Sequence, residues 1–123
     1  MTDSGTLATT AQVLLAIGEG ASADQILEAN TNIWILMAES EMEMEASGNG
    51  GVGLVANYAS ITASYKQWLA MIASVRAAWL GINQDQGNWA LAITQSKLNV
   101  LDAIWQDGIK ELRKPDVIDN MGL

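Results

Sequence analysis

The densest set of groups able to do chemistry is a run of glutamates at every second position, Glu39, Glu41, Glu43 and Glu45. Paired carboxylates can act as acid and base, as they do in glycosidases. On a helix, however, side chains two residues apart do not face each other, and nothing else in the sequence resembles a sugar-binding cleft. We therefore interpret these acids as a solvated or pore-facing surface.

The composition excludes most other catalytic and metal-binding chemistry. The 123 residues include neither cysteine nor histidine, which rules out disulfides, the usual zinc ligand sets, Ser/His and Cys/His nucleophile pairs and the Glu-x-x-His ligands of di-iron bundles. An enzyme would have to use carboxylates, lysines or hydroxyls alone. We therefore expect no catalysis, no metal and no cofactor.

Charge is distributed unevenly along the chain, whose net charge is −8. Residues 1–65 contain eight acids and no base, whereas the remainder balances six acids with six bases. Such an acidic half argues against direct nucleic-acid binding, which depends on Lys and Arg. No export signal is visible at the start, and Arg76 interrupts the longest apolar stretch, so we expect no membrane span.

Residues 48–53 read Gly-Asn-Gly-Gly-Val-Gly, which formally matches the dinucleotide pattern G-x-G-x-x-G. That fingerprint needs a strand before it and an acid about 20 residues after it. Here an acidic helical segment precedes the glycines, and the next acid is Asp85. A turn between two helices is the interpretation that fits.

The elements that position these groups are helices, and the longest is predicted between Leu54 and Ile82. Apolar residues recur there at alternating steps of four and three, the spacing of helices packed nearly parallel. Apolar periodicity and capping residues predict three more: a short helix capped by Thr9 or Thr10 and ended by Gly18, a long one over 23–46, and a last one that begins between 89 and 94 and ends before Pro115.

The predicted fold is therefore a single all-α domain over residues 1–123, an elongated bundle of one short and three long helices. Residues 1–8 are predicted to be a flexible arm. Residues 115–123 are predicted to be a short C-terminal tail, disordered in the free subunit because its few apolar residues cannot form a core alone.

Large apolar side chains exceed what a slim bundle is expected to bury. Residues 33–37, Ile-Trp-Ile-Leu-Met, are apolar all round the helix, which indicates a two-sided core or a subunit contact. Five tryptophans occur in a chain without phenylalanine, and Trp is enriched at protein interfaces. We predict self-association, with Trp34, Trp89 and Trp105 as candidate interface aromatics.

Three segments resemble the head-tail connector (head-completion adaptor) proteins of tailed bacteriophages. These are Ile-Leu-Met-Ala-Glu-Ser-Glu at 35–41, Lys-Leu-Asn-Val-Leu-Asp at 97–102, and the stretch from Ile109-Lys-Glu-Leu to Pro115-Asp-Val-Ile-Asp-Asn-Met121. The order of helices is also similar, over roughly residues 10–121. Residues 89–94 depart from that family, whose last helix begins with a more polar, acid-containing segment.

The resemblance implies a non-catalytic virion protein at the head-tail interface, made in the host cytoplasm. Its subunits would form a ring, usually of twelve, between the portal protein and a tail or stopper protein, and DNA would pass through without sequence-specific binding. The C-terminal tail would dock on the portal or a neighbour through Pro115, Val117, Ile118 and Met121. Glu39, Glu41, Glu43 and Glu45 would face the channel.

An alternative resemblance is to secreted, acidic helical hairpins named for a Trp-x-Gly turn, because Trp79-Leu80-Gly81 lies near the predicted end of the longest helix. Two additional helices before the hairpin argue against it. So does the lack of any tyrosine after the last helix, where those proteins carry a Tyr-x-x-x-Asp/Glu export signal.

Overall fold

The computed structural model describes residues 5–18, 28–46, 53–84 and 91–122, and all regular secondary structure in these ranges is helical. The elements are α1 (Thr10–Ile17), α3 (Glu28–Glu45), the short 3₁₀ helix η2 (Tyr58–Ser60), α4 (Ala63–Gln84), α5 (Leu91–Leu112) and α6 (Pro115–Met121). The predicted all-α bundle of one short and three long helices is confirmed. Residues 48–52 of the glycine-rich segment and Trp89 lie outside the described residues.

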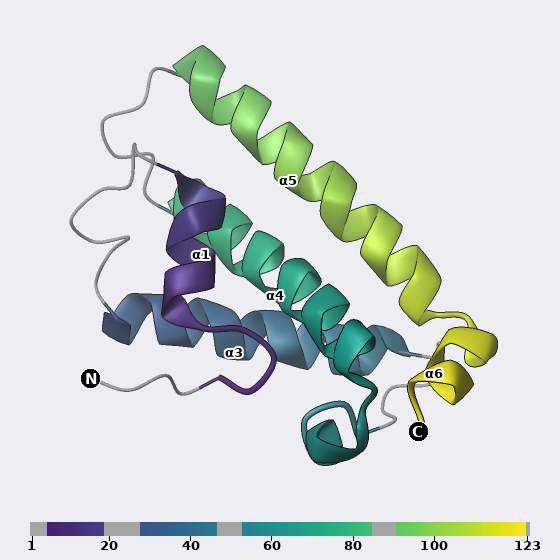
Figure 1. The fold of residues 1–123 in the computed structure, drawn as a ribbon. Coiled ribbons are helices and arrows are strands. Elements are labelled where there is room, and N and C mark those ends of the chain that lie inside the picture. Colours follow the sequence, from purple (N-terminus) through teal and green to yellow (C-terminus); the bar gives the residue numbers. More distant parts are fainter. Residues whose placement is uncertain (1–4, 19–27, 47–52, 85–90, 123) are drawn as a thin grey trace.

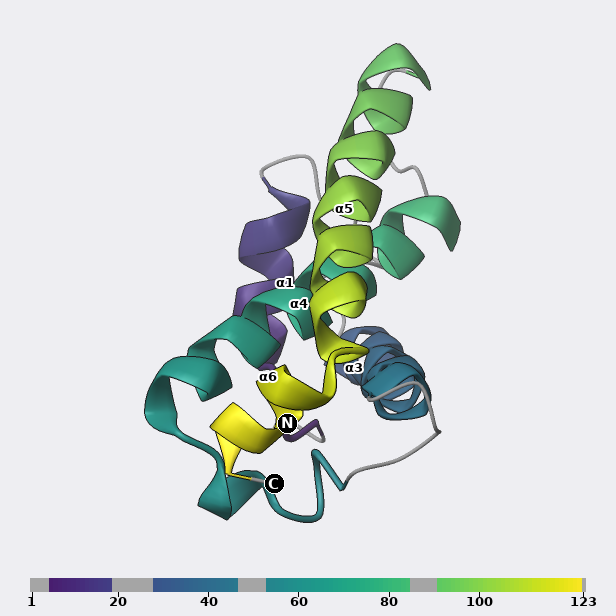
Figure 2. The same ribbon diagram turned by 90° about the vertical axis from the view of Figure 1, so that its right-hand side faces the viewer.

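Helix α4 is the centre of the bundle, with α5 on one side and α1 and α3 on the other (Figure 1). It is buried on several sides at once, because apolar or small residues fill most positions between 69 and 82: Leu69, Ala70, Ile72, Ala73, Ser74, Val75, Ala77, Ala78, Gly81 and Ile82. Helices α4 and α5 have 22 residues each, about 33 Å of helix. One end of α5 extends past the other helices (Figure 2).

Two helical glycines allow neighbouring elements to approach α4 and α5 closely. A Cβ added to Gly108 of α5 would lie 2.7 Å from Ile72 Cγ1 of α4, and one added to Gly81 of α4 would lie 2.8 Å from Trp34 Cζ3 of α3. Helix α4 continues past Gly81 to Gln84. The Trp79-Leu80-Gly81 sequence therefore lies inside a helix, where Gly81 provides room for the Trp34 ring, and not at a hairpin turn.

Replacement of Gly81 by Ala is expected to destabilise the chain by about 1–3 kcal/mol, the usual cost of overpacking a filled core. The clash with Trp34 must outweigh the gain of about 1 kcal/mol that Ala normally gives over Gly in a helix. Urea unfolding followed by circular dichroism measures the difference. In the double variant Gly81→Ala/Trp34→Leu the two losses should not add, because the smaller side chain removes the clash; additive losses would contradict the contact.

The ends of α1 follow the sequence prediction. Thr9 Oγ1 accepts a hydrogen bond from the Gln12 amide, and the Gln12 side chain accepts one from the Thr9 amide, which completes a capping box. At the other end Gly18 has φ +94°, a conformation that glycine adopts without strain, and its amide donates to Leu14 O. The predicted cap and stop of the short helix are therefore confirmed.

The predicted start of the longest helix at Leu54 is wrong, because α4 begins at Ala63. Residues 54–57 form turns and 58–60 form η2, yet Leu54 and Ile61 are buried as the apolar spacing required. Other segments hold this irregular backbone: Leu54 N–H donates to Glu43 (2.9 Å) and Thr62 N–H donates to Met121 O (3.2 Å). The apolar spacing therefore predicts correctly that these two residues are buried, but it does not predict the conformation of the backbone between them.

The predicted disordered tail is also wrong, since Pro115–Met121 forms α6. Proline ends α5 because its ring does not fit a helix interior, but it is well suited to the first turn of the next helix. Ile118 is 5% exposed and Met121 is fully buried, both within the main core. The tail therefore completes the hydrophobic core of its own chain.

The N-terminal arm is corrected in the same way for its described residues, 5–8. Leu7 and Ala8 are 2% and 3% exposed and belong to the core. The backbone amides of Thr6 and Leu7 donate hydrogen bonds to helix α3. This part of the arm is consequently a fixed element of the bundle.

Candidate subunit interface

Glu39 is buried inside the chain, so its predicted position facing a DNA channel is wrong. Its side chain is 5% exposed, and Oε2 accepts hydrogen bonds from Thr6 N–H (2.7 Å) and Leu7 N–H (2.5 Å). A buried carboxylate needs such donors, because desolvation without them is costly. Glu39 therefore fastens the N-terminal arm to α3.

Glu41 forms the best-connected ion pair of the described chain, with Arg76 of α4. Arg76 Nε lies 3.1 Å from Glu41 Oε1, and its terminal nitrogen lies 2.8 Å from Oε2, the forked geometry that favours Arg over Lys. The guanidinium also stacks 4.5 Å from the centre of the Trp79 ring and 5.0 Å from that of Trp105. Arg76 thereby joins α3, α4 and α5.

The last two glutamates of the run also have partners within the chain. Glu43 accepts from Leu54 N–H at 2.9 Å, and Glu45 accepts from Arg113 Nε at 2.7 Å. Glu41, Glu43 and Glu45 are nevertheless partly exposed, so their orientation toward a channel stays a prediction.

The assignment of Trp34 and Trp105 to a subunit interface is wrong, because their side chains are 4% and 5% exposed. The space beside Gly81 accommodates Trp34, and the Arg76 guanidinium covers Trp105. The bundle thus buries both of these large rings within a single chain. Trp89 lies outside the described residues.

Five large apolar side chains remain on the outside of α3 and the adjoining turn. Ile33, Leu36, Met37 and Met44 are 54%, 45%, 42% and 68% exposed, and Val55 is 40% exposed. Together with Ser40, these residues are called the α3 face. Sequence reasoning indicated it only in part: of the all-round apolar run, Trp34 and Ile35 point inward, while the other three residues point outward.

The α3 face is hollowed by two adjoining grooves of about 430 and 470 Å³. The first is lined by Ile33, Leu36, Met37, Ser40 and Glu41, and the second by Leu36, Glu39, Ser40, Glu43, Met44 and Val55. Leu36 and Ser40 belong to both. Contiguous exposed apolar surface with a polar rim is the usual mark of a protein-protein contact site.

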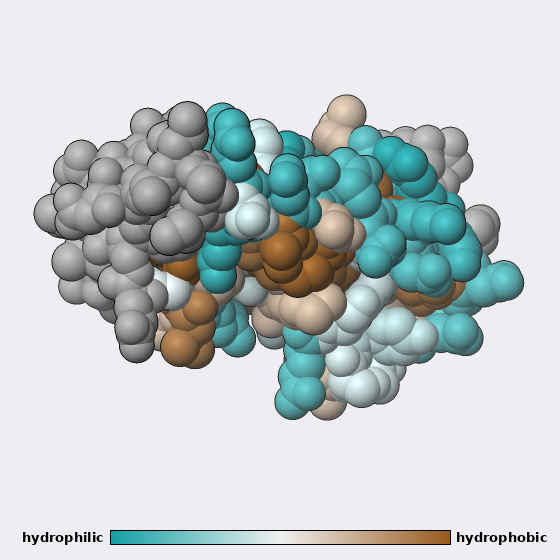
Figure 3. Space-filling model, turned by 90° about the horizontal axis from the view of Figure 1, so that it is seen from above, coloured by the Kyte–Doolittle hydropathy of each residue, from teal (hydrophilic) through white to brown (hydrophobic). Residues whose placement is uncertain are grey.

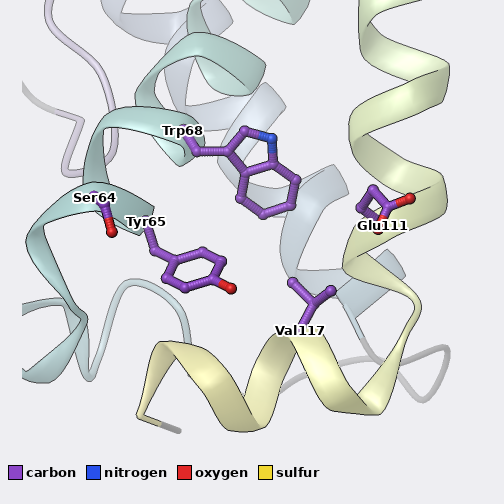
Figure 4. A pocket seen from close by; sticks show the side chains of 5 residues that line it. All are labelled: Ser64, Tyr65, Trp68, Glu111 and Val117. Carbon is purple, nitrogen blue, oxygen red and sulfur yellow. The ribbon is translucent and has the colours of Figure 1, made fainter.

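A third hollow, of about 360 Å³, lies between α4, α5 and α6 (Figure 4). Tyr65 and Trp68 project into it from α4 with their rings edge to face, 6.0 Å apart at 80°, and Val117 projects from α6. Glu111 of α5 also lines it and pairs with Lys114 at 3.0 Å. Of the four predicted docking residues, Ile118 and Met121 are buried, while Val117 remains accessible in this hollow.

Other kinds of site are not seen in the parts of the chain that the structure describes. Within 5–18, 28–46, 53–84 and 91–122, no group of three or more acidic side chains is arranged to hold a metal ion. No helix of these ranges has the length and apolar character needed to cross a membrane. The α3 face is the candidate functional surface because it carries five of the eight large apolar side chains that are exposed among the described residues.

Comparison of the chain with protein-family models, with curated proteins and with solved structures gave no match.

Proposed function

We propose that this chain is the repeating subunit of a ring that joins the head of a tailed bacteriophage to its tail, below the portal protein. The observation that carries the proposal is the α3 face, a broad apolar surface that lies outside the hydrophobic core of the described residues. The sequence resemblance to head-tail connector proteins is the reason for placing this ring between the phage head and tail. The role is structural and does not involve catalysis.

The α3 face supports assembly because the chain does not need it for its own folding. Every described helix except α3 contributes its large apolar residues mainly to the core, with one exposed large apolar residue each on α1, α4 and α5. Burying apolar surface yields about 25 cal/mol per Å², so a neighbour that covers these side chains gains stability. Oligomer interfaces are typically built in this way.

The charge distribution suits a channel through which DNA passes without being held. The chain has only six bases, and Arg76, Arg113 and Lys114 are already paired with Glu41, Glu45 and Glu111. DNA affinity depends on bases that contact phosphates and displace condensed counterions. Few such contacts are available here.

The double variant Met37→Glu/Met44→Glu tests this function. Both side chains are exposed by 42% or more, so the free energy of unfolding should change by no more than about 0.5 kcal/mol. Electron microscopy of the wild-type protein at high concentration should show closed rings with an axial channel, whereas the variant should show none. Sedimentation should report the corresponding loss of mass.

The matched control is Leu15→Glu, which adds one charge at an 82% exposed position on α1 and should leave the rings intact. Wild-type protein that remains monomeric, or that stops at a dimer at every concentration, contradicts the proposal. So does a coding sequence whose neighbours encode no portal, terminase or tail protein.

A further inference from the structure

We infer that the α3 face of one copy is covered by the outer side of α5 from the next copy, a head-to-tail contact. This inference rests on the proposed ring and names the two surfaces that build it. The outer side of α5 carries exposed residues at 4-3-4-3 spacing, called here the α5 line: Ser96, Val100, Ala103, Asp107 and Lys110.

The charges of α3 argue against two copies meeting through the same face. Residues 28–46 contain five glutamates and no base, and Glu41 and Glu45 are paired with Arg76 and Arg113 of other elements. Pairing α3 with α3 would bring two negative surfaces together, which is unfavourable across an interface. The partner surface should therefore be one that carries bases.

The bases of the chain are concentrated on and just after α5. Four of the six, Lys97, Lys110, Arg113 and Lys114, lie between residues 97 and 114, where Asp102, Asp107 and Glu111 also occur, so this stretch has a net charge of +1 against −5 for residues 28–46. Arg113 and Lys114 are already paired within the chain, with Glu45 and Glu111. Lys110 is exposed on the α5 line and has no ion-pair partner among the described residues. It is available to a carboxylate of a neighbouring α3.

The residues of the two surfaces also have the same spacing along their helices. On the α3 face, Ile33, Met37, Ser40 and Met44 follow the same alternating steps of four and three as the α5 line, the spacing at which side chains of two nearly parallel helices interlock. The α3 residues are mostly large, whereas Ser96 and Ala103 are small and can receive them. Val100, 57% exposed, is the one large apolar residue on the α5 line.

The placement of the surfaces suits a ring. Helix α4 lies between α3 and α5 over much of their length (Figure 1), although α3 and α5 also contact each other. Each surface lies on the side of its helix away from the buried residues. The side of the molecule that α5 covers is mostly hydrophilic, with apolar side chains in its middle (Figure 3). A contact between two different surfaces repeats from copy to copy and closes into a ring when the rotation allows.

Cysteine cross-linking tests the contact directly, because the chain contains no cysteine. Met37→Cys protein that carries a tag is mixed with untagged Val100→Cys protein under mild oxidation, so that mixed dimers and homodimers differ in size. Ala103→Cys, about one helical turn further along α5, is a second test position in case the two helices are shifted along each other. The mixed dimer should be the main product, with little homodimer of either variant. A chain carrying both cysteines should form a ladder of covalent oligomers.

The control partner is Leu15→Cys, whose site is more exposed than either test position. Efficient homodimers of Met37→Cys would show a symmetric contact and overturn the inference, as would equal cross-linking to Leu15→Cys or none at all. Rings that form while the α5 cysteines stay unlinked would overturn only this inference. Absence of wild-type rings would overturn the proposed function as well.

Discussion

Removal of the chain after Lys114 is expected to lower the free energy of unfolding by about 4 kcal/mol or more. Deleting one large buried aliphatic side chain typically costs about 2–5 kcal/mol, and this truncation removes Ile118 and Met121, which are 5% and 0% exposed. It also removes Met121 O, the acceptor for Thr62 N–H. Because domains of this kind are stable by only about 5–15 kcal/mol, urea unfolding should show a strongly shifted midpoint.

The matched control is Asn120→Ala, on the exposed side of the same helix, which should leave the midpoint nearly unchanged. Met121→Ala should reproduce a large part of the truncation effect. If the truncated chain keeps its melting temperature and helicity, α6 is not part of the core and acts only as a docking element for another protein.

The helical part of the fold could be predicted from the sequence because it depends on local rules. Alternating apolar steps identify a buried stripe, and the Thr9 cap and the Gly18 stop bound the first helix at the residues observed. These rules fail for residues 54–62, which have helical apolar spacing but do not form one continuous helix. Leu54 and Ile61 satisfy the helical spacing, yet they reach the core from turns that Glu43 and Met121 hold in place.

The roles of individual charged and aromatic residues could not be predicted, because they depend on partners that are distant in sequence. Glu39 binds amides 32 and 33 residues away, Arg76 binds an acid 35 residues away, and Arg113 binds one 68 residues away. Periodicity assigns a residue to one side of its helix, but it does not identify the facing element. The burial of Trp34 has the same kind of cause, since its ring packs against Gly81 of a different helix.

The sequence predicts that α3 is covered on more than one side, but it does not predict which residues point outward. A helix that is apolar all round must be covered on more than one side, and residues 33–37 have this property. The structure adds which side the chain covers itself, through Trp34 and Ile35, and which side it leaves open, through Ile33, Leu36 and Met37.

Replacement of Glu39 by Ala is expected to lower the free energy of unfolding by about 3 kcal/mol. Each hydrogen bond to a charged group contributes about 1.5–3 kcal/mol, and a buried donor left without an acceptor adds its desolvation cost. The variant loses the acceptor for both Thr6 N–H and Leu7 N–H. Their amide hydrogens should therefore exchange with solvent much faster, which NMR can measure together with urea unfolding.

Glu39→Gln separates the contribution of the charge from that of the acceptor, because its amide oxygen can still accept from both amides. Its loss should be clearly smaller than that of Glu39→Ala, and Ser40→Ala, at the exposed neighbouring position, should have almost no effect. A Glu39→Ala protein with wild-type stability and slow exchange at Thr6 and Leu7 would show that the carboxylate does not hold the arm.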